Sequence, residues 1–81
     1  MLILGQQRKL IINTNALDMI GIRQDGTTIG FLINSQGIPA DGILGKYSNE
    51  ETAKAVLLNL FDSFDAGIPA FKMPPEQEDN P

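Results

Sequence analysis

The chain has 81 residues, a formal net charge of −4, and neither cysteine nor histidine. This length allows one small domain, and the missing cysteines exclude disulfide bridges and thiolate metal sites. Because cysteine and histidine are also the commonest nucleophile and base, we predict a protein that is not an enzyme and holds no metal or cofactor.

The negative charge is concentrated at one end of the chain. Residues 74–81 contain three of the ten acidic residues and none of the six basic ones, so residues 1–73 carry a net charge of −1. We expect a single domain over residues 1–73 and an acidic, proline-rich, disordered tail over 74–81. A body so close to neutral argues against general nucleic-acid binding, which needs clustered Lys and Arg.

No apolar run reaches the ~18–20 residues that a membrane-spanning helix needs. The apolar residues 1–4 lack the preceding basic segment and the cleavage site of a signal peptide. We therefore expect a cytoplasmic protein that contacts no membrane.

The N-terminal part of the chain predicts three short strands separated by polar turns. They are expected at residues 1–4, 10–12 and 17–23. Apolar residues in the third do not alternate regularly, which indicates a bulge or a late strand start near Asp18.

Asp25-Gly26 is the clearest hairpin signal, because glycine readily adopts the positive φ that such a turn requires. A fourth strand is expected after it, at residues 28–34. Two glycines, a proline and an aspartate in residues 35–42 predict a loop, and residues 43–47 a fifth strand.

One amphipathic helix is predicted over residues 49–66. Ser48 and Glu51 have the spacing of a capping box at its start. Gly67 suits the left-handed position after its end, and Pro69 prevents continuation. Six apolar residues recur at helical spacing and are expected to form one buried stripe: Ala53, Val56, Leu57, Leu60, Phe61 and Phe64.

Residues 70–73 are expected to form a last edge segment, held by Phe71 and Met73. The sequence thus predicts an α+β domain, with an antiparallel sheet of about five strands and the helix packed across one face. A strongly curled sheet, like a pleckstrin-homology half-barrel, is an accepted variant.

Five residues are candidates for binding an anionic ligand: Arg8, Lys9, Arg23, Lys46 and Tyr47. Each is expected in a turn or at a strand end. If these ends converge, the basic side chains surround an anion near the helix N-terminus, where free amides also point outward. Tyr47 would then stack on a base or ring. The alternative is that these residues are solvated charges at strand ends.

Leu32 and Leu58 are candidates for a subunit interface. Leu58 lies beside the apolar stripe of the helix, and Leu32 lies on the second face of its strand. Both indicate more buried surface than one helix on one sheet requires, so we expect a homo-oligomer. Asp62 and Asp65 have the spacing to share a cation, but a solvated helix face is the ordinary interpretation.

Residues 43–57 combine a Leu-Gly-x-Tyr strand end with a capped helix that carries an Ala-x-x-Val-Leu face. An Ile-Leu strand at 2–4, an Asn-bearing turn at 13–17 and Phe-x-Met-Pro at 71–74 accompany them. In this pattern the chain resembles a family of small uncharacterised proteins from phages and mobile elements of Gram-positive bacteria. The long segment 35–42 departs from the family's pattern, and a family without known activity implies no active site.

The resemblance implies a phage setting, and with it the cytoplasm of the host cell, in which small proteins without catalytic motifs often block a host protein or sequester a signalling molecule. Our first hypothesis is a phage-type binding protein, an anti-defence sponge for a nucleotide-like molecule. The alternative is a protein–protein interaction or assembly module that binds a host or phage protein and no small ligand. An enzyme that acts on nucleotides through carboxylates alone is a third and weaker hypothesis.

Overall fold

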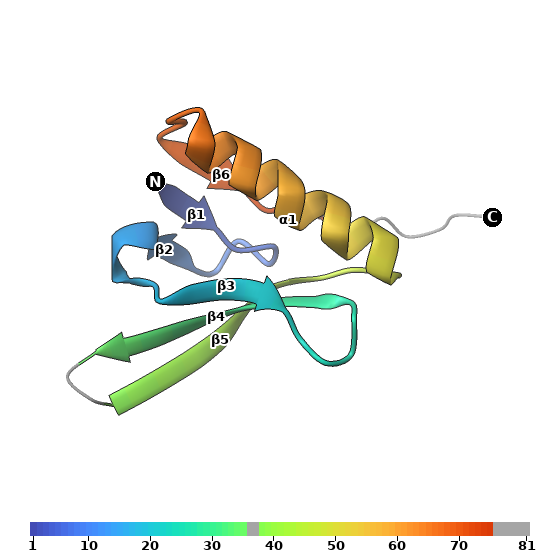
Figure 1. Cartoon of the computed structure of the whole chain (residues 1–81), viewed down its shortest axis with the longest axis horizontal. Helices are drawn as coiled ribbons and strands as arrows, with labels where there is room; N and C mark the ends of the chain where they lie inside the picture. The colour runs from blue at the N-terminus through green and yellow to red at the C-terminus, as the bar shows by residue number, and fades with distance from the viewer. Residues whose placement is uncertain (36–37, 76–81) are drawn as a thin grey trace.

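The computed structural model describes residues 1–35 and 38–75, so most of the expected disordered tail lies outside the described residues. Figure 1 shows one long helix lying across short strands, with a long hairpin extending from the opposite side. In chain order the elements are β1 (Leu2–Leu4), β2 (Ile11–Asn13), a 3-10 helix, η1 (Thr14–Ala16), β3 (Met19–Ile22), β4 (Thr28–Ser35), β5 (Ile38–Lys46), α1 (Glu50–Asp65) and β6 (Ala70–Lys72).

The described strands form two three-stranded sheets. In the first sheet β1 lies between β2 and β6, antiparallel to β2 and parallel to β6. In the second sheet β4 lies between β3 and β5, and both pairs are antiparallel. The α+β class with one helix is confirmed. The single antiparallel sheet is wrong, because the chain returns through α1 and places β6 beside β1 in the same direction.

The Asp25-Gly26 hairpin is confirmed. Gly26 has a φ of +78°, and the amide of Arg23 donates to the carbonyl of Thr28 across the turn at 2.8 Å. The Asp25 carboxylate accepts hydrogen bonds from the Thr28 hydroxyl and from the amides of Thr27 and Thr28. These bonds, the hydroxyl first, lower the pKa of Asp25 to about 2.

The expected loop at residues 35–42 is wrong for the part that the structure describes. β4 extends to Ser35 and β5 begins at Ile38, so the two strands form one long hairpin. Gly42 lies opposite Phe31 in this strand pair, and a Cβ on Gly42 would clash with the Phe31 ring that lies over it. A strand glycine often marks such a close approach. The irregularity foreseen near Asp18 is a late start of β3 at Met19.

The N-cap of α1 lies one residue later than expected. The N-cap is Asn49, whose side chain accepts from the Thr52 amide at 2.8 Å, so the capping box of Ser48 and Glu51 is wrong. The C-terminal end follows the prediction, since Gly67 has a φ of +74°. The Gly67 amide donates to the Phe64 carbonyl, and the Ile68 amide donates to the Ser63 carbonyl. This pair of bonds is a Schellman motif.

One hydrophobic core joins α1 to both sheets. The buried apolar residues are Ile3, Ile12, Ile29, Leu44, Tyr47, Ala53, Val56, Leu60 and Met73. Only part of the expected helix stripe contributes, because the side chains of Phe61 and Phe64 are 63% and 56% exposed. The stripe that packs is therefore narrower than the apolar arc of the helix.

Candidate functional site: an apolar groove beside α1

Arg8 connects two parts of the fold through a hydrogen bond of its side chain. Arg8 has a φ of +62°, in the left-handed region, within the turn between β1 and β2. Its guanidinium donates to the Met73 carbonyl at 2.9 Å. The group thereby holds the end of β6 against this turn, and one of its donors is already occupied.

Tyr47 is a core residue rather than a stacking surface. Its side chain is 2% exposed, and its hydroxyl donates to the Pro74 carbonyl at 2.8 Å. The ring covers Gly45, where a Cβ would be 2.9 Å from the hydroxyl oxygen. Burial raises the pKa of Tyr47 to about 12. The expectation that Tyr47 stacks on a ligand is wrong in this conformation, because neither ring face is open.

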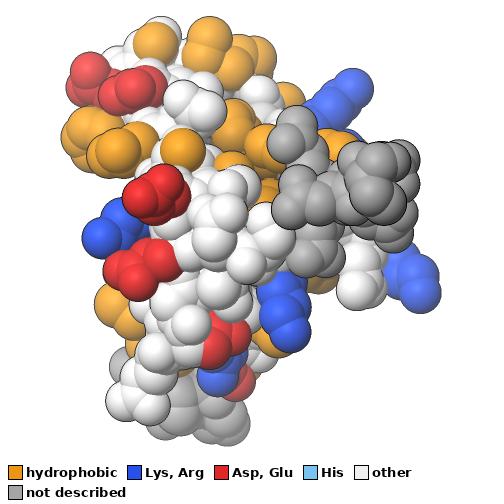
Figure 2. All heavy atoms as spheres, turned by 90° about the vertical axis from the view of Figure 1, so that its right-hand side faces the viewer, with side chains coloured by type: hydrophobic (Ala, Val, Ile, Leu, Met, Phe, Trp, Pro, Cys, Tyr) orange, Lys and Arg blue, Asp and Glu red, His pale blue; other side chains and the backbone are white. Residues whose placement is uncertain are grey.

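The remaining basic candidates lie at two different hollows. Arg23 forms an ion pair with Asp41 at 3.4 Å and lines a hollow of about 260 Å³ on the β3–β5 sheet. Lys9 and Lys46 line a separate hollow of about 170 Å³ between the first turn and β5. Figure 2 shows Lys and Arg side chains scattered singly over the visible face. The five candidates therefore do not line one common hollow.

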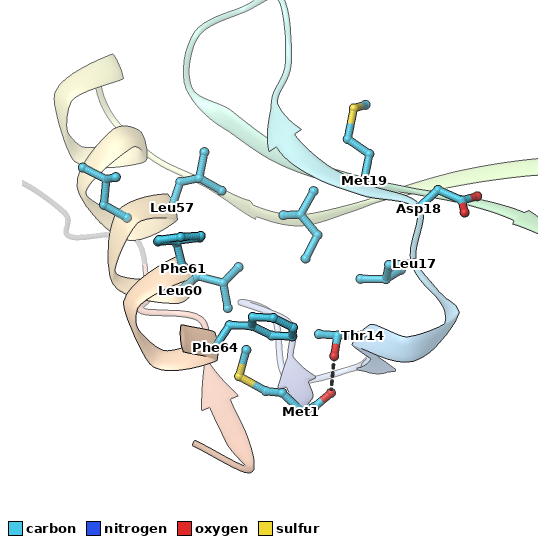
Figure 3. A pocket seen from close by; sticks show the side chains of 11 residues that line it. Met1, Thr14, Leu17, Asp18, Met19, Leu57, Leu60, Phe61 and Phe64 are labelled. Atoms are coloured by element: carbon cyan, nitrogen blue, oxygen red, sulfur yellow. Dashed lines mark hydrogen bonds between the residues drawn. The ribbon is translucent and has the colours of Figure 1, made fainter. Parts of the chain in front are cut away.

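A larger, mostly apolar groove lies along α1. It has a volume of about 480 Å³ and separates α1 from the 3-10 helix and β3. Figure 3 shows the Phe64 ring extending from the helix toward Met1 and Thr14. The lining residues are Met1, Thr14, Leu17, Asp18, Met19, Ile20, Leu57, Leu58, Leu60, Phe61 and Phe64.

Exposed apolar side chains border this groove on both sides. Leu58, Phe61 and Phe64 on α1 are 62%, 63% and 56% exposed, and Met19 on β3 is 59% exposed. Figure 2 shows hydrophobic side chains gathered in the upper part of the visible face, where the helical layer lies. Single exposed apolar residues are ordinary, but a contiguous group around a groove marks an interaction surface.

The two interface candidates from the sequence lie at neighbouring hollows. Leu58 lines the groove, and the half-buried Leu32 lines the hollow that contains Arg23. Met19 lines both and is the direct cross-strand neighbour of Leu32. The sequence pattern does not predict Met19, Phe61 or Phe64 at a surface groove. For the two phenylalanines, the width of the apolar arc of the helix, from Val56 round to Leu58, was a usable signal.

The groove offers little polar chemistry. Thr14 and Asp18 are its polar lining residues, and the Thr14 hydroxyl donates to the Met1 carbonyl at 3.1 Å. Among residues 1–35 and 38–75, no cluster of three or more Asp or Glu has an arrangement that holds a metal ion. In the same residues, no helix has the length and apolar character needed to cross a bilayer.

No family model, curated protein or solved structure matches the chain. The resemblance to phage and mobile-element proteins therefore stays a prediction from the sequence.

Proposed function

We propose that this chain is a non-enzymatic interaction module that binds a protein through the groove and its exposed apolar rim. The observation that carries this proposal is the row of Leu58, Phe61 and Phe64, all more than half exposed, beside a groove of about 480 Å³. Burial of one such side chain contributes about 1.5–3 kcal/mol. A partner that covers the row therefore gains free energy from each of the three side chains, in proportion to the apolar area that it buries.

The chemistry of the groove favours a protein over a small polar ligand. Small-molecule sites combine an apolar lining with several convergent polar groups that fix the ligand's orientation. Here the Thr14 hydroxyl already donates to a backbone carbonyl. Exposed Phe and Met side chains, such as those beside this groove, are enriched in the cores of protein interfaces.

Such a surface fits a protein that acts by binding to another protein and blocking it. A phage-type protein that blocks a host or phage protein, the alternative weighed from the sequence, needs a binding surface and no catalytic group. The groove supports this proposal, and the resemblance in sequence adds the setting.

The test is photo-crosslinking in the cell that produces the protein. Phe61 is replaced by the photoreactive p-benzoylphenylalanine, and the matched control carries the same residue at Asn59, an exposed position on another side of α1. We expect covalent protein adducts from position 61 and none from position 59. Equal labelling from both positions, or none from position 61, contradicts the proposal.

A second candidate is the sequestration of a nucleotide-like anion, favoured by the shared hollow of Lys9 and Lys46. With a cyclic dinucleotide as the probe, we expect a rise in Tm of the wild-type protein that disappears in the variant Lys9→Ala/Lys46→Ala. No rise in the wild type, or an equal rise in the variant, contradicts this candidate.

A further inference from the structure

We propose that the partner of the groove is a second copy of this chain, with the two α1 helices packed antiparallel across a two-fold axis. This inference rests on the proposed function, because it names the occupant of the same surface. A two-fold interface uses the same patch twice, so that each residue i that meets j is matched by j meeting i. The apolar side of α1, with Lys54 and Asp65 beside it, meets this requirement in one arrangement of the two helices.

The exposed side of α1 has the spacing of a helix–helix seam. Leu57, Phe61 and Phe64 follow one another at intervals of four and three residues, the spacing that keeps a stripe on one side of a helix. Ile68, just after the helix end, is a further apolar residue and is 44% exposed. This seam lies beside the buried stripe of Ala53, Val56 and Leu60. The helix therefore presents a second apolar side, which the chain's own sheets leave partly uncovered.

Two charged residues that flank the seam, Lys54 and Asp65, meet a residue of opposite charge only when the second helix runs antiparallel. Lys54 and Phe61 are seven residues apart, as are Leu58 and Asp65, so each pair lies on nearly the same line along the helix. If the two-fold axis passes between Leu58 and Phe61, the Leu58 side chain of one copy meets Phe61 of the other. In the same register Lys54 meets Asp65 of the second copy, at both ends of the seam.

A parallel pair would instead place Lys54 against Lys54 and Asp65 against Asp65. Like charges in direct opposition destabilise a helix pair, and the antiparallel arrangement also opposes the two helix dipoles favourably. Lys54 and Asp65 are both exposed and thus accessible to a second copy. Within one copy Lys54 contacts Glu50 at 3.2 Å, with both side chains more than 60% exposed.

The other occupants fit the surface less well. Residues 76–81 (Glu-Gln-Glu-Asp-Asn-Pro) bring no large apolar side chain to an apolar groove. A membrane surface attracts helices whose apolar side is bordered by Lys and Arg. α1 has four acidic residues, Glu50, Glu51, Asp62 and Asp65, and one basic residue, Lys54. Anionic lipids would therefore repel it.

Sedimentation equilibrium of the purified chain from micromolar to millimolar concentration tests the dimer. We expect a reversible monomer–dimer equilibrium that Leu58→Asp weakens at least a hundredfold, while the control Asn59→Asp leaves it within about threefold. Leu58 is 62% exposed, so its aspartate variant remains folded, which circular dichroism verifies. A wild-type chain that stays monomeric, or a dimer indifferent to Leu58→Asp, overturns the inference.

Charge reversal tests the register. Each of Lys54→Asp and Asp65→Lys turns two attractive contacts per dimer into repulsive ones, and we expect about tenfold weaker association for each. The double variant Lys54→Asp/Asp65→Lys restores opposite charges and is expected to return to within about threefold of the wild type. Additive losses in the double variant overturn the antiparallel pairing.

Cysteine trapping tests the direction, because the natural chain contains no cysteine. Under mild oxidation, we expect Lys54→Cys protein mixed with Asp65→Cys protein to form mixed disulfides in preference to either self-linked dimer. Preferential self-linking of each variant indicates a parallel pair and overturns the inference.

Failure of this inference and failure of the proposed function give different results. A monomeric purified chain together with a photo-adduct of position 61 to a different protein overturns the dimer and retains the interaction module. An adduct of twice the chain's mass supports both. A monomeric chain without any adduct from position 61 overturns both.

Discussion

At the scale of single residues, two of the five side chains expected to bind a ligand, Arg8 and Tyr47, instead donate hydrogen bonds to the chain's own backbone. Together with Gln6 they converge on the segment that follows β6. The Arg8 guanidinium donates to the Met73 carbonyl, and the Tyr47 hydroxyl and the Gln6 amide donate to the Pro74 carbonyl. Met73 itself is fully buried. These contacts fix the last strand against the first turn and the end of β5.

Tyr47 gives this arrangement a measurable pH dependence. Its pKa is raised by burial to about 12, from an ordinary value of 10.0 that we assign to the unfolded chain. The folded protein therefore keeps the phenol proton over a range in which the unfolded chain loses it. The stabilisation is fully present below pH 10 and is lost as the pH rises toward 12, by about 3 kcal/mol in total.

Because Tyr47 is the single tyrosine, tyrosinate absorbance reports on it alone. We expect absorbance to titrate near pH 12 while the chain is folded, and chemical denaturation to show the falling free energy of unfolding. In Tyr47→Phe the extra loss above pH 10 disappears, and at neutral pH the missing hydrogen bond to Pro74 costs about 1 kcal/mol. Titration of the folded protein at pH 10 would contradict this account.

At the scale of elements, α1 shows what helical periodicity predicts and what it leaves open. The spacing of apolar residues correctly predicted the helix, and Gly67 correctly predicted its C-terminal end. Both signals depend on local backbone preferences. It assigned Phe61 and Phe64 to the core, yet both are more than half exposed. Periodicity gives the direction of an apolar face, whereas the width that packs depends on how much sheet lies beneath it.

The helix cap and β5 differ from the prediction for two different reasons. Ser48 and Asn49 are both good N-caps, and Asn49 is the one whose side chain reaches the Thr52 amide. Gly42 favours a loop in the sequence, but in the fold it makes room for the Phe31 ring. The position of β5 thus depends on a three-dimensional neighbour, which a one-dimensional pattern does not contain.

The candidate site was only partly predictable for the same reason. Leu58 stood out because it lies outside the main stripe, and the structure places it on the rim of the groove. Met19 carried no signal in the sequence, because its role depends on β3 lying opposite α1. The five candidates for an anion site do not form one site. Strand ends that look equivalent in the sequence lie at different hollows of the structure.

At the scale of the whole molecule, two small sheets act as one body because they share a core and a polar link. Residues from both sheets and from α1 contribute to the buried cluster. The polar link is Gln6, which follows β1 and borders β5. Its backbone amide donates to the Leu44 carbonyl at 2.8 Å. Its side chain accepts from the Lys46 amide and donates to the Lys46 carbonyl, both at 2.8 Å.

The Gln6 side chain thus replaces a strand residue, because its amide offers the same donor and acceptor as a peptide group. We expect Gln6→Ala to lower the free energy of unfolding by about 1–2 kcal/mol, since two hydrogen bonds to Lys46 are lost at a partly exposed site. The matched control is Gln7→Ala, an exposed neighbour in the same turn, which is expected to change stability by less than about 0.5 kcal/mol.

Gln6→Glu separates the two halves of this link. A carboxylate still accepts from the Lys46 amide, so hydrogen exchange of that amide stays slow, whereas Gln6→Ala accelerates it. The carboxylate cannot donate to the Lys46 carbonyl and places an acceptor opposite it, so Gln6→Glu loses stability even though the amide remains protected. If Gln6→Ala leaves both the stability and the Lys46 amide unchanged, the shared core alone joins the two sheets, and Gln6 is not the link that its geometry indicates.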